Sequence, residues 1–121
     1  MNDFVFRKEG FSSSREELLL NETLFHNANG YLGVRSNFEE EYDGQPSIRG
    51  EYVNAFYDIT DMPQAELLYG FPTRKQTMVN TCDTQTIRLT IGNETFSLFK
   101  GTVLSFAREL DMKAGTTRRL V

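Results

Sequence analysis

The sequence predicts a mainly β fold built from antiparallel strands. Apolar and polar residues alternate along several stretches of the chain, which is the pattern of strands with one covered face. The ten Phe and five Tyr among the 121 residues also favour strands, because aromatic side chains pack well on pleated surfaces. Hydrophobic residues make up 39% and charged residues 25%, so the chain suits one globular domain.

The N-terminal part predicts a strand followed by a short helix. Alternating Phe residues place the first strand within residues 4–11. Ser14 followed by Glu17 forms a capping box, in which a hydroxyl and a carboxylate close the first turn of a helix. We therefore expect a short helix near residues 14–20 or 23–28.

The central part predicts two strands separated by loops. Residues 31–38 and 51–59 both alternate. The second of these strands has one apolar face and one face that mixes aromatic and polar groups. Residues 41–50 and 60–77 contain Gly and Pro at several positions, which predicts irregular structure.

The C-terminal part predicts hairpins. Residues 85–100 alternate on both sides of Gly92 and Asn93, two residues that tolerate the positive φ of a tight turn. Residues 102–112 alternate again, a second turn is expected at residues 113–115, and another strand follows.

Composition excludes several classes of protein. The net charge is −4, so a basic surface for nucleic acid is not expected. The apolar runs fall far short of the ~20 residues that span a bilayer, and the N-terminus lacks a signal-peptide pattern. Cys82 is the sole cysteine, which excludes an internal disulfide framework and favours a reducing, cytoplasmic location. With His26 as the only histidine, no metal site is expected.

The carboxylates are interpreted as structural. The densest acidic cluster consists of Glu39, Glu40, Glu41 and Asp43. Dense like charges usually lie on an exposed surface, which indicates a solvated loop. Asp58 and Asp61 are a spaced pair, interpreted as a strand end and a turn. Because no set of acid, base and nucleophile can be assembled, we expect no catalytic residue in the chain.

Two blocks of sequence are the most informative. The first matches E-[ST]-L-F, then G/A-N-G-Y-L-G-[VT]-R, an acidic run, and R-G-x-Y-[VLI]-N-x-x-Y-[DE]; the second matches L-D-[ML]-[KR]-x-G-x-x-x-R. The matching residues are Glu22, Thr23, Leu24, Phe25, Asn29, Gly30, Tyr31, Leu32, Gly33, Val34, Arg35, Glu39, Glu40, Arg49, Gly50, Tyr52, Val53, Asn54, Tyr57, Asp58, Leu110, Asp111, Met112, Lys113, Gly115 and Arg118. In this order the blocks resemble the N-terminal segment of glycoside hydrolase family 65, the disaccharide phosphorylases and hydrolases that act on maltose, trehalose, kojibiose and related α-glucosides.

The resemblance implies a domain organisation. The N-terminal domain of that family is a large antiparallel β-sandwich, a galactose-mutarotase-like supersandwich, followed by a helical linker and an (α/α)6 barrel. Residues 1–121 would then be about half of the sandwich, a truncated part of a larger enzyme without its catalytic barrel. Such a partial sandwich is expected to self-associate. Its uncovered face would include apolar positions among Phe96, Leu98, Leu104, Phe106 and Leu110.

The resemblance also implies a function. The parent enzyme would cleave α-glucosidic disaccharides by inverting phosphorolysis or hydrolysis, with its acid and its inorganic phosphate bound in the barrel. This chain alone is therefore expected to be inactive, to carry no cofactor and to hold no phosphate. Its expected partners are the barrel of the same polypeptide, the disaccharide substrate, and a second copy in a homo-oligomer such as a dimer.

The candidate site residues are those that the resemblance places at an interdomain contact or an active-site rim. They are Asn29, Tyr31, Arg35, Arg49, Tyr52 and Asn54. The glycines beside Asn29 would alternatively mark only a turn into a strand. Arg35 and Arg49 would brace the interface by bidentate pairing, or pair with Glu39 or Glu51 within the sandwich.

A stand-alone carbohydrate-binding or interaction module is the alternative function. Aromatic rings pack on sugar faces, and Tyr42, Tyr52, Tyr57 and Tyr69 are the candidates for such a platform. Exposure discriminates between the two functions, because coplanar exposed rings favour sugar binding and buried rings favour a scaffold.

Overall fold

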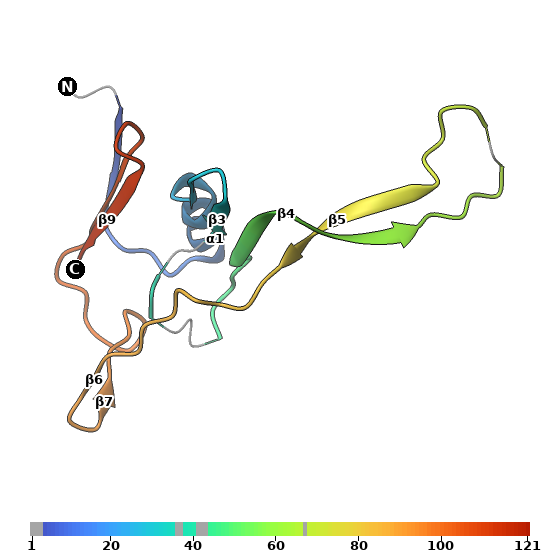
Figure 1. Ribbon diagram of the computed structural model, residues 1–121. Coiled ribbons are helices and arrows are strands. Elements are labelled where there is room, and N and C mark those ends of the chain that lie inside the picture. Colours follow the sequence, from blue (N-terminus) through green and yellow to red (C-terminus); the bar gives the residue numbers. More distant parts are fainter. Residues whose placement is uncertain (1–3, 36–37, 41–43, 67) are drawn as a thin grey trace.

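The computed structural model describes residues 4–35, 38–40, 44–66 and 68–121 (Figure 1). Within these ranges the chain forms one helix and nine strands. In chain order they are β1 Val5–Glu9, α1 Arg15–Leu24, β2 Asn27–Ala28, β3 Leu32–Arg35, β4 Gly50–Asp61, β5 Arg74–Asn80, β6 Thr90–Ile91, β7 Glu94–Thr95, β8 Ala107–Asp111 and β9 Thr116–Leu120.

The strands form three antiparallel sheets. Their orders are β1-β8-β9, β2-β3-β4-β5 and β6-β7. The first sheet joins the two ends of the chain, since β1 pairs with β8 from Val5 opposite Asp111 to Glu9 opposite Ala107. The predicted mainly antiparallel β fold is therefore confirmed.

Helix α1 starts where the capping box predicts and extends further than expected. The hydroxyl of Ser14 accepts a hydrogen bond from the backbone N–H of Glu17 at 3.3 Å. The helix continues to Leu24 because contacts to the rest of the fold stabilise it. Lys8 of β1 contacts Glu17 and donates to Asn21 at 2.9 Å, which ties the helix to the first sheet.

The core is small and aromatic. Leu18 of α1, Phe38 and Leu98 are buried together, and the partly buried Phe11, Phe99, Val103 and Phe106 pack against them. The rings of Phe38 and Phe99 meet edge to face with centroids 5.6 Å apart. The core thus lies between the helix and the segment that leads into β8.

Strand β5 corrects one prediction. Residues 60–77 were expected to be irregular, yet Arg74–Asn80 is a strand that pairs with β4. The local Gly and Pro signals describe only the connection between the two strands. Residues 74–80 form a strand because they pair with β4, and the sequence pattern of the segment itself does not indicate a strand.

Strand β4 contains a bulge that divides it into two parts. Tyr52 pairs with Asn80, whereas Tyr57 pairs with Met78, so the register shifts between them. Ala55 has φ 61° at this point, a conformation that costs a non-glycine residue roughly 1–2 kcal/mol. The alternation predicted over residues 51–59 is broken here. Beyond the bulge, β4 and β5 continue as a two-stranded ribbon that projects away from the rest of the molecule (Figure 1).

Both predicted C-terminal turns are present. Thr90 pairs with Thr95 and Ile91 with Glu94, so a hairpin turns at Gly92 and Asn93. Its strands have only two residues each, shorter than expected, and the apolar side chain of Ile91 is 71% exposed. The second hairpin joins β8 to β9 through residues 112–115.

The acidic cluster is only partly the solvated loop that the sequence predicts. Glu40 is 3% exposed, and Arg119 of β9 donates to both of its carboxylate oxygens, at 3.0 and 2.6 Å. Glu39 remains exposed and lies 2.8 Å from the same guanidinium. The interpretation is wrong for Glu40 because its cationic partner is distant in sequence. Glu41 and Asp43 lie outside the described residues.

Candidate functional site

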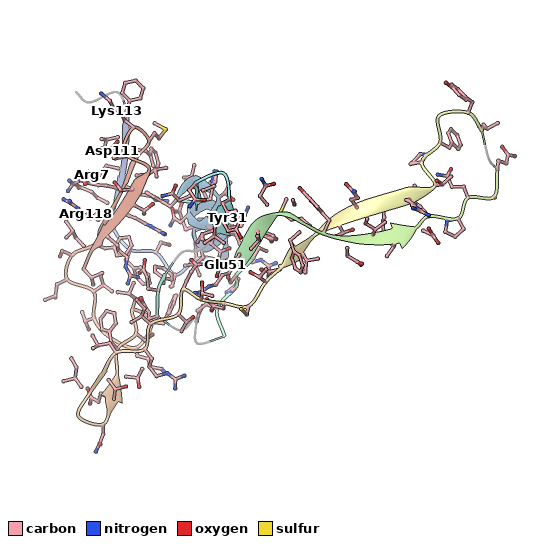
Figure 2. The ribbon with its side chains drawn as sticks, viewed as in Figure 1. Arg7, Tyr31, Glu51, Asp111, Lys113 and Arg118 are labelled. Atoms are coloured by element: carbon pink, nitrogen blue, oxygen red, sulfur yellow. The ribbon has the colours of Figure 1, made fainter. Side chains whose placement is uncertain are left out.

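The Asn-Gly-Tyr segment forms the turn between β2 and β3. The side-chain carbonyl of Asn29 accepts hydrogen bonds from the backbone N–H groups of Tyr31, at 2.9 Å, and Leu32, at 2.8 Å. Gly30 has φ 83°, which favours glycine. The turn places Tyr31 at the surface, where it is 69% exposed (Figure 2).

This turn is joined to the first part of β4. The backbone N–H of Asn54 donates to the carbonyl of Tyr31 at 2.8 Å, and Leu32 pairs with Val53. Strand and turn enclose a shallow cleft of about 240 Å³, which we name the β3–β4 cleft. Its lining residues are Ala28, Gly30, Tyr31, Leu32, Gly33, Tyr52, Val53, Asn54, Tyr57 and Met78.

The ring of Tyr52 folds back over Gly50. A Cβ atom added to Gly50 would lie 2.6 Å from both Cε2 and Cζ of the tyrosine. Such a distance is far below van der Waals contact, so only glycine leaves room for the ring in this position. The spacing of the R-G-x-Y pattern therefore has a steric explanation, and it fixes one wall of the β3–β4 cleft.

The structure brings together four of the six candidate site residues. Tyr31, Tyr52 and Asn54 line the cleft, and Asn29 holds the turn that forms its rim. Sequence reasoning included Tyr57 as a motif residue and a sugar platform but not as a candidate site residue, and it missed Met78, which reaches the cleft through the pairing of β4 with β5. No local signal around Met78 would have found it.

Arg35 and Arg49 lie apart from the β3–β4 cleft. Arg35 donates to the hydroxyl of Thr23 at 2.6 Å, and Arg49 contacts Asp83 at 2.7 Å. The expected pairing with Glu39 or Glu51 is therefore wrong. Glu39 pairs with Arg119, as described above, and Glu51 accepts hydrogen bonds from Thr84.

A second, smaller pocket of about 150 Å³ lies beside Arg49 and Glu51. Glu51 is 5% exposed and accepts from the hydroxyl of Thr84 at 2.5 Å and from its N–H at 3.0 Å (Figure 2). These hydrogen bonds from Thr84 hold the pKa of Glu51 below its usual value. Donation from the Thr86 hydroxyl, at 2.6 Å, likewise lowers the pKa of Asp83, with help from the charge of Arg49.

Carboxylates of this kind are poor proton donors. A lowered pKa keeps Glu51 and Asp83 ionised near neutral pH, whereas a general acid needs a pKa close to the working pH. Thr84, in the segment that follows β5, donates to Glu51 of β4, and Asp83 in the same segment pairs with Arg49 just before β4, so both carboxylates fasten that segment to the start of β4. The chemistry of this pocket is therefore structural.

The tyrosines that were candidates for a sugar platform differ in exposure. Tyr57 and Tyr69 are exposed, Tyr52 is half-buried, and Tyr42 lies outside the described residues.

His26 is exposed with its Nδ1 2.5 Å from the carbonyl of Thr23, and Cys82 is exposed. In the described part of the chain, no group of three or more His, Cys, Asp or Glu could hold a metal ion, and no helix is long and apolar enough to cross a membrane.

Comparison with known proteins decides the family. The glycosyl hydrolase family 65 N-terminal domain matches residues 6–121. The chain belongs to this family. It is 50% identical over 109 residues to an α,α-trehalose phosphorylase of Geobacillus stearothermophilus, covering 88% of this chain and 14% of that protein. It is 43% identical over 121 residues to an α,α-trehalose phosphorylase of Thermoanaerobacter brockii, covering 98% and 15%.

A solved structure shares the fold of this family 65 N-terminal domain. It is a protein from the human microbiome assigned as a kojibiose phosphorylase, with a TM-score of 0.78 and 27% identity. The match covers 96% of this chain and 15% of that one. The chain thus spans about one seventh of the length of the relatives that it resembles.

Proposed function

We propose that the chain is the non-catalytic N-terminal β-domain of an enzyme that cleaves α-glucosidic disaccharides by inverting phosphorolysis or hydrolysis. The observation that carries this proposal is the family match over residues 6–121, together with relatives named as trehalose, maltose and kojibiose phosphorylases. In this proposal the catalytic (α/α)6 barrel belongs to the same polypeptide. The enzyme is cytoplasmic, uses inorganic phosphate as a co-substrate bound outside this chain, and forms a homo-oligomer, a dimer.

The geometry of the cleft supports a non-catalytic role. Glycoside hydrolysis needs two carboxyl groups roughly 5–10 Å apart on opposite sides of the scissile bond, and phosphorolysis, in which phosphate attacks, still needs one carboxyl group as the acid. Among the described residues that line the β3–β4 cleft, none is acidic. The buried carboxylates of Glu22, Glu40 and Glu51 accept hydrogen bonds from the chain itself, so they position loops and strands.

The proposal is tested by comparing the 121-residue chain with the full-length polypeptide that contains it. With phosphate and trehalose, maltose or kojibiose, the full-length protein is expected to release glucose 1-phosphate or glucose from at least one disaccharide, and the short chain from none. Release by the short chain that disappears when one of its own carboxylates is changed would contradict the proposal. Absence of activity on all three disaccharides in the full-length protein would contradict it as well.

A further inference from the structure

The projecting ribbon has one face that is apolar next to the bulge and charged at its far end, and one face that is polar throughout. We name this ribbon the arm and define it as residues 57–61 of β4 with residues 74–78 of β5. Directly paired residues of antiparallel strands share a face. From the register, one face carries Tyr57, Ile59, Asp61, Arg74, Gln76 and Met78, and the other carries Asp58, Thr60, Lys75 and Thr77. Tyr57, Ile59 and Met78 are 42%, 56% and 51% exposed, so the apolar face is open.

The apolar face of the arm continues into the β3–β4 cleft. Tyr57 and Met78 belong to both, because they form the pair at which the arm leaves the bulge. Together they make one surface, which we name the arm–cleft surface and define as Tyr31, Leu32, Val53, Tyr57, Ile59 and Met78. All six are uncharged. At the far end of the arm, the same face ends in the ion pair of Asp61 and Arg74, whose atoms lie 3.4 Å apart.

An arm of this kind needs a covering partner. A two-stranded ribbon alone is marginally stable in water, and this one, formed by β4 and β5 beyond the bulge in β4, projects away from the body of the molecule (Figure 1). The whole chain exposes 9006 Å², about one third more than the roughly 6,700 Å² expected of a compact monomer of its mass. The excess is large enough for an interdomain interface of roughly 600–1,500 Å².

The length of the relatives identifies the partner. The kojibiose phosphorylase structure keeps the arrangement of 96% of this chain with a TM-score of 0.78, although this part is 15% of that protein. The extended layout is therefore one that occurs within a much longer chain. A segment tethered in the same polypeptide has an effective concentration of roughly millimolar, which favours it over a second copy.

We propose that the arm–cleft surface is the docking face for the polypeptide that in these relatives makes up the remaining six sevenths of the chain. The segment that docks is apolar at its centre, to match Tyr57, Ile59 and Met78, and it leaves the polar face of the arm in water. This proposal rests on the proposed function, since it requires that the chain continue into a larger protein.

The first test uses Met78 of the unaltered full-length protein. Met78 is 51% exposed in the 121-residue chain, so it would oxidise readily if nothing covered it. With dilute peroxide and mass spectrometry, we expect Met78 to oxidise several-fold more slowly than the methionines of the denatured protein. Oxidation of Met78 at the denatured rate would overturn the proposal.

The second test identifies the occupant. A photo-crosslinking amino acid is placed at Ile59 on the apolar face or, as a matched control, at Thr60 on the polar face of the full-length protein. The Ile59 variant is expected to form adducts within one polypeptide, to residues beyond 121, several-fold more often than the Thr60 variant. Adducts between two copies, or equal yields from the two positions, would overturn the proposal.

The two proposals fail in different ways. Activity is measured on the unaltered full-length enzyme, and it tests the proposed function without reference to the arm. If that enzyme is active while Met78 is unprotected, only the docking face is wrong. If the enzyme has no activity while Met78 is protected and Ile59 crosslinks beyond residue 121, the docking face stands and the proposed function fails.

Discussion

Gly50 and Tyr52 show how a single hydrogen in place of a methyl group shapes the candidate site. The tyrosine ring occupies the space that a Cβ atom at position 50 would fill. A larger residue at this position pushes the ring away from the wall of the β3–β4 cleft. The glycine therefore acts through the tyrosine, and the two residues are expected to be energetically coupled.

A double-mutant cycle measures this coupling. Gly50→Ala is expected to destabilise the chain when Tyr52 is present, and to cost about 1–2 kcal/mol less in the Tyr52→Ala background, because the clash is then absent. The free energies of unfolding come from urea titrations. Equal costs of Gly50→Ala in both backgrounds would show that the ring does not occupy this space.

Glu39 and Glu40 differ in burial although they are neighbours and contact the same guanidinium. Glu40→Ala removes two hydrogen bonds from Arg119 in a buried site, while Glu39 still contacts that guanidinium, so it is expected to cost about 1.5–3 kcal/mol. The side chain of Glu39 is 48% exposed, and exposed pairs contribute roughly 0.2–1 kcal/mol. Thermal or urea unfolding of the two variants checks the contrast, and equal losses would contradict it.

At the scale of elements, local chemistry predicts the parts that short-range contacts determine. The Ser14 cap and the turn at Gly92 and Asn93 are confirmed because a hydrogen bond within four residues, or a required positive φ, defines each of them. Strand β5 was missed, and so was the burial of Glu40. Both depend on pairing with distant segments, and Glu40 contacts Arg119, which lies 79 residues away.

The contrast between local sequence signals and distant pairing also explains which residues of the candidate site could be predicted from the sequence. Tyr31, Tyr52 and Asn54 were found because they belong to motifs of the family, and the cleft brings them together. Arg35 and Arg49 belong to the same motifs but reach Thr23 and Asp83 in other parts of the fold. Motif membership selected the candidate residues, and only the strand pairing shows which of them share a surface.

The segment of residues 81–86 is held to β4 by ionised carboxylates, which predicts a pH dependence. The pKa of Glu51 is lower in the folded chain than its usual 4.5. The unfolded chain thus binds the proton more tightly, and the contribution of Glu51 to stability is complete above about pH 4.5 and is lost as the pH falls through the folded pKa. We expect stability to fall below pH 4.5, and Glu51→Gln to weaken this dependence.

Removal of the donor is the control for this pH effect. Thr84→Val lacks the hydroxyl that contributes most to the lowered pKa of Glu51. It is therefore expected to weaken the pH dependence in the same direction as Glu51→Gln, while leaving the carboxylate in place. Urea unfolding between pH 3 and 7 provides the comparison. A Glu51→Gln variant with the unaltered pH dependence would contradict the role assigned to this carboxylate.

At the scale of the whole molecule, the chain has a small core and a large surface. The uncovered face was expected among residues 96–110, but Leu98 is buried and Phe106 packs against it. Leu104, at 94% exposed, fits the expectation. Three other exposed apolar side chains, Tyr57, Ile59 and Met78, lie on the arm, which sequence reasoning did not identify because residues 60–77 were expected to be irregular.

The 121-residue chain by itself is therefore expected to self-associate through apolar surface. Without the polypeptide that we propose as its cover, the arm–cleft surface faces water, and exposed apolar surface of this kind promotes pairing. Sedimentation equilibrium over a concentration series should show a rising average mass. Ile59→Ser, on the apolar face, should weaken the association, and Thr60→Ser, one residue away on the polar face, should leave it unchanged. A strict monomer at every concentration would mean that these side chains are covered within the chain itself, and equal effects of the two substitutions would place the contact elsewhere on the molecule.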